Sequence, residues 1–266
     1  MMTKYFNRIL FAGFILIAGC NPAQDGPRLI KVGATAGPST ALMEVAKKVA
    51  KEQYDLEIDI VEFTDYATPN TALNEGSIDA NAFQTLTYFE ATLAAKGYQL
   101  TAIGVTFIYP MGIYSNKIGE LSQLSDNATV AIPNDPSNEG RALLLLQKAG
   151  LITLDDTTEA QLTPRNIINN PKQLRIQVLD SAQLPRALAD VDIAAINTDY
   201  AVIAGLSPIE DALFSEGKDS PYANIIAVRT EDKDNEALQQ LLKSYQSQAV
   251  IDTAETLFKG NAIPAW

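Results

Sequence analysis

The sequence predicts an α/β fold of two lobes, each with a mixed, mostly parallel sheet, and three observations support this prediction. Short apolar runs alternate with amphipathic stretches at helical spacing, which is typical of strands that are joined by helices. The roughly 245 residues that follow Cys20 suffice for one large domain or two modest ones. The order of these elements also lets the chain leave a first group of strands once and return to it near its end.

Lobe I is expected to contain residues 29–108 and 225–266. Its strands are predicted at residues 29–34, 56–63, 78–83, 100–107 and 224–228, and its helices at residues 39–53, 70–75, 87–96 and 236–258. Leu56, Ile58 and Ile60 alternate with acidic residues, which indicates a strand that is exposed on one face. These elements are expected to make one compact lobe.

Lobe II is expected to contain residues 109–224. Its strands are predicted at residues 112–115, 129–133, 174–179 and 193–197, and its helices at residues 140–149, 182–189 and 199–204. Two crossover segments, near residues 107–112 and 222–229, would then connect the lobes. A small ligand would bind in the cleft between the lobes, beside these crossovers.

The first 19 residues have the pattern of a signal peptide, because Lys4 and Arg8 precede an apolar run at residues 9–18. The run is too short for a permanent membrane span. It ends in Ile-Ala-Gly-Cys, which resembles the bacterial lipobox, so Cys20 is expected to be acylated and to anchor the protein to a membrane. The alternative is an ordinary thiol at Cys20. Residues 20–28 would form the lipidated cysteine and a short tether.

Composition excludes several classes of function. Cys20 is the single cysteine and the chain has no histidine, so disulfides, most zinc sites and serine triads are excluded, and we predict no cofactor and no metal. The net charge of -12 disfavours nucleic acid as a partner of the folded part.

The stretch from Ala131 to Arg141 holds the clearest candidate binding residue. It contains a strand end, the turn Pro-Asn-Asp-Pro-Ser-Asn and then the start of a helix, which places Arg141 beside free backbone N–H groups. The planar guanidinium of arginine suits a carboxylate, so Arg141 is a candidate anion ligand. The alternative is an ion pair between Arg141 and a surface carboxylate.

Two aromatic clusters, at residues 63–70 and 78–88, follow predicted strands. Their rings Tyr66, Phe83 and Tyr88 suit the wall of a cleft or a hydrophobic core equally well. Asn197 and Asn224 lie at predicted strand ends, where an amide can accept a hydrogen bond from an ammonium group or can cap a turn.

Taken together, these motifs resemble the methionine-binding lipoproteins of the NlpA type, from about residue 29 to residue 266. The segments that carry the resemblance are Asp65-Tyr66 with Pro69-Asn70, residues 76–84, residues 133–141, Gln183-Leu184-Pro185-Arg186, Ile196-Asn197-Thr198 with Tyr200, and Ser220-Pro221-Tyr222 with Asn224. The resemblance implies a two-lobed fold like that of periplasmic binding proteins. It also implies a monomer that delivers methionine or a related amino acid to an ABC transporter, and no enzyme.

The resemblance further implies roles for individual residues. Arg141 and Asn138 would hold the ligand carboxylate, and Asn197 and Asn224 would hold the ammonium group. The residues expected to enclose the ligand side chain are Tyr66, Phe83 and Tyr88, with Phe107 and Tyr109 completing the wall. The chain departs from the family pattern at Thr85, where these proteins usually have a histidine that faces the ligand side chain, so the size and polarity of the pocket are expected to differ.

Three alternatives stay open at this point. The same fold could bind another small amino acid or a short peptide. An envelope hydrolase could use the paired carboxylates Asp65 and Asp79, or Asp135 and Glu139. A lipoprotein that acts as an adhesin or assembly factor would have no cleft for a small molecule. The sequence also leaves open which membrane holds the anchor.

Overall fold

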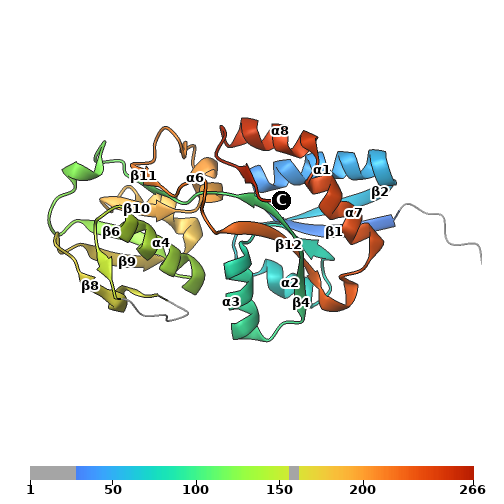
Figure 1. Cartoon of the computed structure of the whole chain (residues 1–266), viewed down its shortest axis with the longest axis horizontal. Helices are drawn as coiled ribbons and strands as arrows, with labels where there is room; N and C mark the ends of the chain where they lie inside the picture. Colours follow the sequence, from blue (N-terminus) through green and yellow to red (C-terminus); the bar gives the residue numbers. More distant parts are fainter. Residues whose placement is uncertain (1–27, 156–161) are drawn as a thin grey trace, which may run out of the picture.

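The computed structural model describes residues 28–155 and 162–266, which form two main β-sheets that lie one after the other along the longest axis (Figure 1). We call the first sheet and the helices on it lobe I. Its strands lie in the order β13, β4, β12, β3, β1, β2. Their bounds are β1 Arg28–Thr35, β2 Leu56–Phe63, β3 Ala80–Asn81, β4 Leu100–Ile108, β12 Ala223–Arg229 and β13 Ile263–Pro264.

Lobe II is built on the second sheet, whose strands lie in the order β11, β5, β10, β6, β9. Their bounds are β5 Gly112–Tyr114, β6 Thr129–Pro133, β9 Arg175–Leu179, β10 Ile193–Ile196 and β11 Phe214–Ser215. A separate pair joins β7 (Thr153–Leu154) to β8 (Ile167–Asn169). The chain passes from the first sheet to the second between β4 and β5 and returns between β11 and β12.

The two sheets are mixed, as expected, but parallel pairing does not predominate. In lobe I, β1 pairs in parallel with β2 and β3, whereas β12 runs antiparallel to β3 and β4, and β13 runs antiparallel to β4. In lobe II, β6 pairs in parallel with β9 and β10, and β5 runs antiparallel to β10 and β11. The antiparallel pairs arise because β5 and β12, the first strand after each passage, run against their neighbours, and β13 runs in the same direction as β12.

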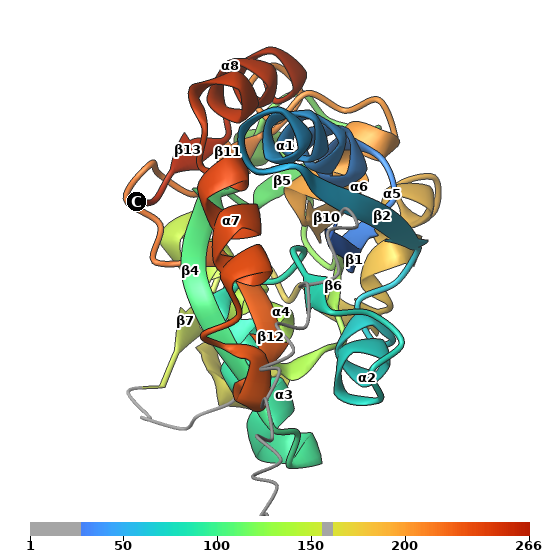
Figure 2. The ribbon, with the colours of Figure 1, turned by 90° about the vertical axis from the view of Figure 1, so that its right-hand side faces the viewer.

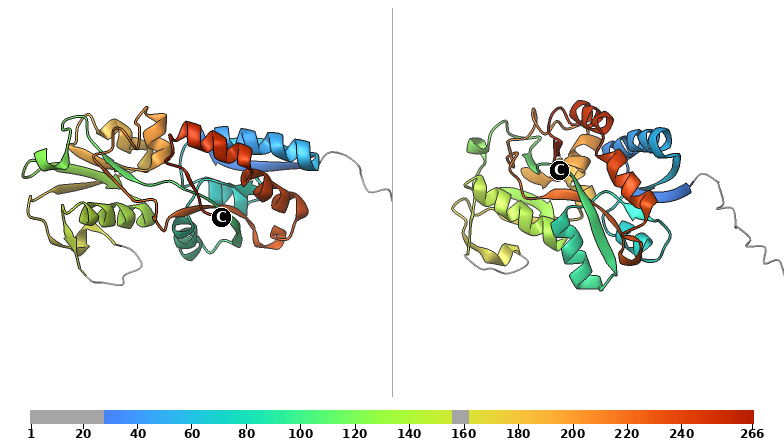
Figure 3. Two further views of the ribbon diagram at one scale, coloured as in Figure 1. Left: turned by 45° about the horizontal axis from the view of Figure 1, so that its top comes forward. Right: turned by 45° about the vertical axis from the view of Figure 1, so that its right-hand side comes forward.

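Helices cover both faces of the lobe I sheet (Figure 2), and alternate side chains of the sheet pack against them. Ile226 and Val228 of β12 pack on one face with α1 (Pro38–Tyr54), α7 (Glu236–Tyr245) and α8 (Gln248–Leu257). Ile225 and Ala227 point to the other face, which α2 (Pro69–Asn74) and α3 (Leu86–Lys96) cover. Helices α1 and α8 run side by side in both views of Figure 3, although they are far apart in sequence.

The lobe II sheet shows the same alternation. Ile193 and Ala195 of β10 pack in the core beneath α4 (Pro136–Lys148), whereas Ala194 and Ile196 pack with the elements on the opposite face. The helices of that face are α5 (Leu184–Ala187) and α6 (Thr198–Ile203). Each sheet therefore has two buried faces, as the apolar runs of its strands indicate.

Helix α4 begins at Pro136, four residues before its predicted start at residue 140. Asp135 caps the helix by accepting a hydrogen bond from the backbone of Asn138, and Pro136 occupies the first helical position, where its missing N–H is tolerated. Asn138 and Arg141 therefore belong to the first two turns of the helix, close to its N-terminal end.

The single helix predicted at residues 236–258 is wrong, because the structure has two helices, α7 and α8, with a break at Ser247. The buried residues explain the break. Leu241 and Tyr245 lie on one face of α7, whereas the next buried residues are Val250 and Ala254. The step of five from Tyr245 to Val250 would turn the apolar face away from the sheet in a continuous helix.

Short elements were the ones that the sequence pattern did not predict. Strands β7, β8, β11 and β13 have two or three residues each, and β3 spans only Ala80–Asn81 of the strand predicted at residues 78–83. The 3₁₀ turns are η1 (Leu121–Gln123), η2 (Pro164–Asn166), η3 (Ser181–Gln183) and η4 (Thr230–Asp232). Hydrophobic periodicity cannot be recognised in segments as short as these.

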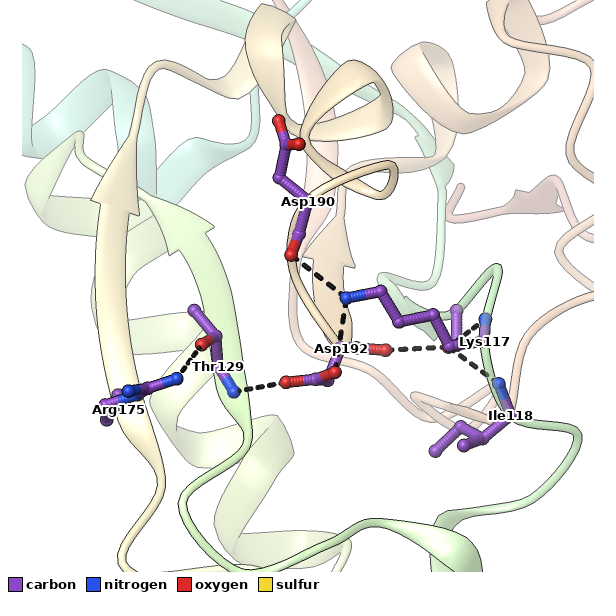
Figure 4. A network of polar contacts seen from close by, with 7 residues as sticks. Lys117, Ile118, Thr129, Arg175, Asp190 and Asp192 are labelled. Atoms are coloured by element: carbon purple, nitrogen blue, oxygen red, sulfur yellow. Dashed lines mark hydrogen bonds and ion pairs between the residues drawn. The ribbon is translucent and has the colours of Figure 1, made fainter.

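A polar network closes the outer end of lobe II, where strands β6, β9 and β10 begin (Figure 4). The Asp192 carboxylate accepts a hydrogen bond of 2.7 Å from the backbone N–H of Thr129 and pairs with Lys117 at 3.3 Å. Arg175 donates to the Thr129 hydroxyl at 3.0 Å. The Thr129 N–H and Lys117 lower the pKa of Asp192. The opposite ends of β6 and β10 therefore remain available for a site.

In the part of the chain from residue 28 onward that the structure describes, no helix combines the length and the apolar character needed to cross a membrane.

Candidate functional site

A cavity lies where the two lobes meet, with about 380 Å³ of space between atoms, part of which is open to solvent. Only about 30 Å³ of it can hold the centre of a water molecule, so the lobes close tightly around it. Its walls contain Tyr66, Phe83, Gln84, Thr85, Tyr88, Tyr109, Asn138, Arg141, Asn197, Thr198, Asp199 and Asn224.

These residues come from loops that follow strands of both sheets. Tyr66 follows β2, Phe83 follows β3, Asn138 follows β6 and Asn197 follows β10. Ligand sites of open α/β sheets lie beyond the carboxyl ends of the strands, and this cavity collects such ends from two sheets that face each other.

Nine of the ten predicted ligand contacts line the cavity, and Phe107 does not. Phe107 is fully buried in β4, where its ring lies 5.9 Å from Tyr109, 6.2 Å from Tyr245 and 5.1 Å from Trp266, between ring centroids. Phe107 lies within β4 and packs in the core of lobe I, whereas Tyr109 follows the end of the strand at Ile108 and reaches the cavity. We therefore remove Phe107 from the candidate contacts.

Arg141 is 3% exposed and is held by a carboxylate of the protein. Its Nε donates to Oε1 of Glu216 at 2.8 Å and its Nη2 donates to Oε2 at 2.6 Å. Nη2 also donates to the carbonyl oxygen of Tyr109 at 2.9 Å, and the guanidinium lies 4.3 Å from the ring centroid of Tyr222. The fork that was expected to take a ligand carboxylate is thus filled by Glu216. Among the described residues, Nη1 has no hydrogen-bond partner.

The amide of Asn138 connects the capping residue of α4 to β10. Its Nδ2 donates to the Asp135 carboxylate at 3.0 and 3.1 Å, and its Oδ1 accepts from Nδ2 of Asn197 at 2.9 Å. Burial raises the pKa of Asp135, against the opposing effect of these hydrogen bonds. Because Asn197 uses its Nδ2 in this way, its Oδ1 is left buried without a partner.

Asp199 was not predicted as a site residue, although it follows Asn197 by two positions. It is 5% exposed, and its Oδ2 accepts hydrogen bonds from the hydroxyls of Thr35 at 3.3 Å and Ser39 at 3.2 Å. Its Oδ1 has no partner among the described residues. Burial raises the pKa of Asp199 to about 6, and the two hydroxyls oppose this rise. Its place at the carboxyl end of β10 was the signal that could have identified it.

Four aromatic rings form one wall of the cavity region. The ring centroid of Tyr66 lies 5.8 Å from that of Phe83, 6.1 Å from that of Tyr88 and 4.9 Å from that of Tyr200. The hydroxyl of Tyr88 donates to the carbonyl oxygen of Tyr66 at 2.7 Å. Tyr66 belongs to lobe I and Tyr200 to lobe II, so the rings also join the two lobes. The wall suits an apolar or thioether side chain.

A buried amide cluster supports this wall from behind. The amides of Asn70 and Gln84 donate to each other at 2.7 Å in both directions. Gln84 also donates to Oδ1 of Asn81 at 2.9 Å, and Asn81 donates to Oδ1 of Asn70 at 2.9 Å. The cluster fixes the backbone on both sides of Phe83.

Thr85, where the resemblance led us to expect a histidine, caps α3. Its Oγ1 accepts a hydrogen bond of 3.2 Å from the backbone N–H of Tyr88, and its backbone forms an isolated bridge with Asn224. Because the side chain is short, it helps to orient Tyr88 and still borders the cavity.

The carboxylates considered for hydrolysis are engaged elsewhere. Asp65 accepts from the backbone of Ala67 and Thr68 in a turn, and Asp79 pairs with Arg229 at 3.0 Å. None of Asp65, Asp79, Asp135 and Glu139 lines the cavity. Within residues 28–155 and 162–266, no group of three acidic, histidine or cysteine side chains is arranged to hold a metal ion.

The polar groups of the cavity are arranged for a molecule with both charges. A cationic donor, Arg141, lies in its wall together with buried oxygen acceptors that lack partners on Asn197 and Asp199. Buried acceptors without partners are costly, so a ligand that donates to them would be stabilised. A carboxylate, an ammonium group and an apolar side chain match the three kinds of wall.

The profile of the family described as NlpA lipoprotein matches residues 30–266. The D-methionine-binding lipoprotein MetQ of Salmonella typhi is 46% identical over 256 residues, which cover 96% of this chain and 94% of that protein. A solved ABC transporter periplasmic substrate-binding protein from Coxiella burnetii is 54% identical, with a TM-score of 0.86, over 89% of this chain and 100% of that one. A nutrient-binding protein from Burkholderia cenocepacia bound to methionine is 47% identical, with a TM-score of 0.87 and the same coverage.

Proposed function

Because this chain belongs to the NlpA lipoprotein family, we propose that it is a solute-binding protein for methionine or a related amino acid. The ligand binds in the cavity between the lobes, and the closed form delivers it to an ABC transporter. The relative from Salmonella typhi is named for D-methionine, and the structure from Burkholderia cenocepacia holds methionine. The Coxiella burnetii structure is named as a periplasmic substrate-binding protein of an ABC transporter, which supports the proposed delivery to a transporter.

One observation carries the proposal: the cavity between the lobes combines a buried arginine with partnerless oxygen acceptors and an aromatic wall. An α-amino acid with an apolar side chain satisfies all three. Nη1 of Arg141 would donate to its carboxylate, and Oδ1 of Asn197 would accept from its ammonium group. Tyr66, Phe83 and Tyr88 would pack against its side chain, since a thioether packs well on aromatic edges.

We further propose that the protein is held on the outer side of a bacterial membrane by an acylated Cys20, which lies outside the described residues. Residues 1–19 would be removed as a signal peptide, and residues 20–28 would tether the fold to the lipid. In this proposal lobe I comprises residues 29–108 and 225–266 and lobe II comprises residues 109–224. The two lobes of a monomer open and close around the ligand without covalent chemistry.

Thermal unfolding of protein purified without its lipid tests the proposal. L-methionine, D-methionine, the other amino acids and short peptides are added in turn, and we expect one of the methionine enantiomers or a close relative to raise Tm. Arg141→Ala should abolish the shift. Arg165→Ala is the matched control, because Arg165 is exposed and does not line the cavity. An unchanged Tm with every amino acid and peptide would refute the function.

A further inference from the structure

We propose that Asp199 is a specificity-determining residue that links ligand recognition to closure of the lobes. Its Oδ2 binds hydroxyls of lobe I, and its Oδ1 receives the ammonium group of the ligand. This inference rests on the function proposed above. It assigns to Asp199 a role in ligand binding that the sequence motifs did not indicate.

The Oδ2 atom makes contacts that exist only when the lobes are together. Asp199 belongs to the first turn of α6 in lobe II, whereas Thr35 ends β1 and Ser39 lies in the first turn of α1, both in lobe I. The two hydrogen bonds, of 3.3 and 3.2 Å, therefore cross from one lobe to the other. Opening the lobes would expose the carboxylate to water and break both.

The start of α1 is suited to a negative charge from the other lobe. The helix has 17 residues, no acidic residue in its first turn and no side-chain cap at Gly37. The partial positive charge at a helix N-terminus favours a nearby carboxylate. Close packing adds to this, because a Cβ atom at Gly37 would lie 2.8 Å from Cγ1 of Ile203 in α6.

The Oδ1 atom is buried and has no partner in the described chain, and Asp199 lines the cavity. The other charged residue of the cavity wall is Arg141, whose charge is already balanced by Glu216 at 2.6 Å. No cationic side chain of the cavity wall therefore pairs with Asp199. An ammonium group supplies both the charge and the hydrogen-bond donors that Oδ1 lacks.

The groups around Asp199 do not compensate it. Thr35 and Ser39 are neutral, and burial raises the pKa values of Tyr66, Tyr109 and Tyr245 above that of an ordinary phenol, so these rings stay protonated at neutral pH. A closed cavity without ligand thus contains a poorly stabilised carboxylate, whereas a closed cavity with an amine does not. A ligand shifts a conformational equilibrium only through such a difference between states.

Calorimetric titration of the mature chain, solubilised in mild detergent, tests this inference with L-methionine and its analogue without the amine, 4-(methylsulfanyl)butanoate. At pH 7.5 we expect Asp199→Asn to weaken methionine binding by roughly 30-fold or more. The same substitution should change binding of the analogue by less than about threefold, because the analogue places no cation at Oδ1. Asp234→Asn, which removes the same charge from an exposed position, is the control.

A second measurement does not depend on a variant. Titration of the unsubstituted chain near pH 6 in two buffers of different ionisation enthalpy should show net release of protons on methionine binding, because the bound ammonium keeps Asp199 ionised. Methionine binding that is unaffected by Asp199→Asn, or that releases no proton near pH 6, would overturn the inference and leave the proposed function standing. Failure of the unsubstituted chain to bind any amino acid would instead refute the proposed function.

Discussion

The carboxylate of Glu216 accepts hydrogen bonds from Nε and Nη2 of Arg141, at 2.8 and 2.6 Å, and both side chains are less than a tenth exposed. The backbone N–H of Met111 and the hydroxyl of Ser220 also donate to Glu216, at 2.9 and 3.0 Å. Met111 and Ser220 lie in the two passages between the lobes. The pair therefore fixes the orientation of Arg141 and ties α4 to both passages.

Glu216→Gln should destabilise the protein by roughly 3 kcal/mol, because it leaves the buried guanidinium of Arg141 without a compensating charge. Urea unfolding at neutral pH measures the change as a lower midpoint with the same slope. Glu231→Gln, at an exposed position, is the matched control and should change the stability by less than about 0.5 kcal/mol. Equal stability of the two variants would mean that Arg141 does not depend on Glu216.

In the closed conformation, Asp199 should make the ligand-free protein less stable as the pH rises. Burial raises its folded-state pKa to about 6, above the usual value of 3.8, so the folded state holds this proton more tightly than the unfolded state. The contribution is fully present below pH 3.8 and is lost as the pH rises through about 6. The predicted loss is on the order of 3 kcal/mol by pH 7.

Comparison with Asp199→Asn isolates this contribution from those of the other carboxylates. Without ligand, the variant should be more stable than the unsubstituted chain at pH 7, and the difference should be markedly smaller at pH 4.5. Urea unfolding of both proteins at the two pH values measures the difference. A difference that is the same at both pH values would mean that Asp199 does not titrate in this range.

The sequence predicted the parts of the site that lie in one continuous motif. Asn138 and Arg141 follow one strand and share the first turns of one helix, so their proximity depends only on local structure. The carboxyl ends of β3 and β10 likewise carry Phe83 and Asn197 into the cavity, since loops at strand ends of an α/β sheet meet at one edge.

The partners that come from distant segments could not be predicted. Glu216 lies 75 residues after Arg141, in an irregular segment without hydrophobic periodicity, and nothing local indicates that it fills the guanidinium fork. Asp199 meets Thr35 across the closed cleft, which depends on how two separately folded sheets face each other. Phe107 shows the converse error, because a ring beside a crossover can point into the core.

The buried amide cluster should be essential for stability as well as for the shape of the aromatic wall. Gln84→Met keeps the size of the side chain but removes its amide. Nδ2 of Asn70 then has lost its acceptor, and Oδ1 of Asn81 has lost the N–H that donates to it. Each buried polar group without a partner costs about 1–3 kcal/mol, so we expect a loss of roughly 2–4 kcal/mol in urea unfolding. Gln99→Met, at an exposed position, is the control.

The same variant should also weaken ligand binding, because Gln84 lies between Phe83 and Thr85 and its carbonyl oxygen accepts a hydrogen bond of 2.9 Å from the N–H of Ile225. Loss of the amides frees this segment to move, and the ring of Phe83 then no longer lies in one position against Tyr66. Calorimetric titration with L-methionine, at a temperature where the variant remains folded, measures the effect. Full affinity together with reduced stability would show that the cluster supports the fold without shaping the cavity.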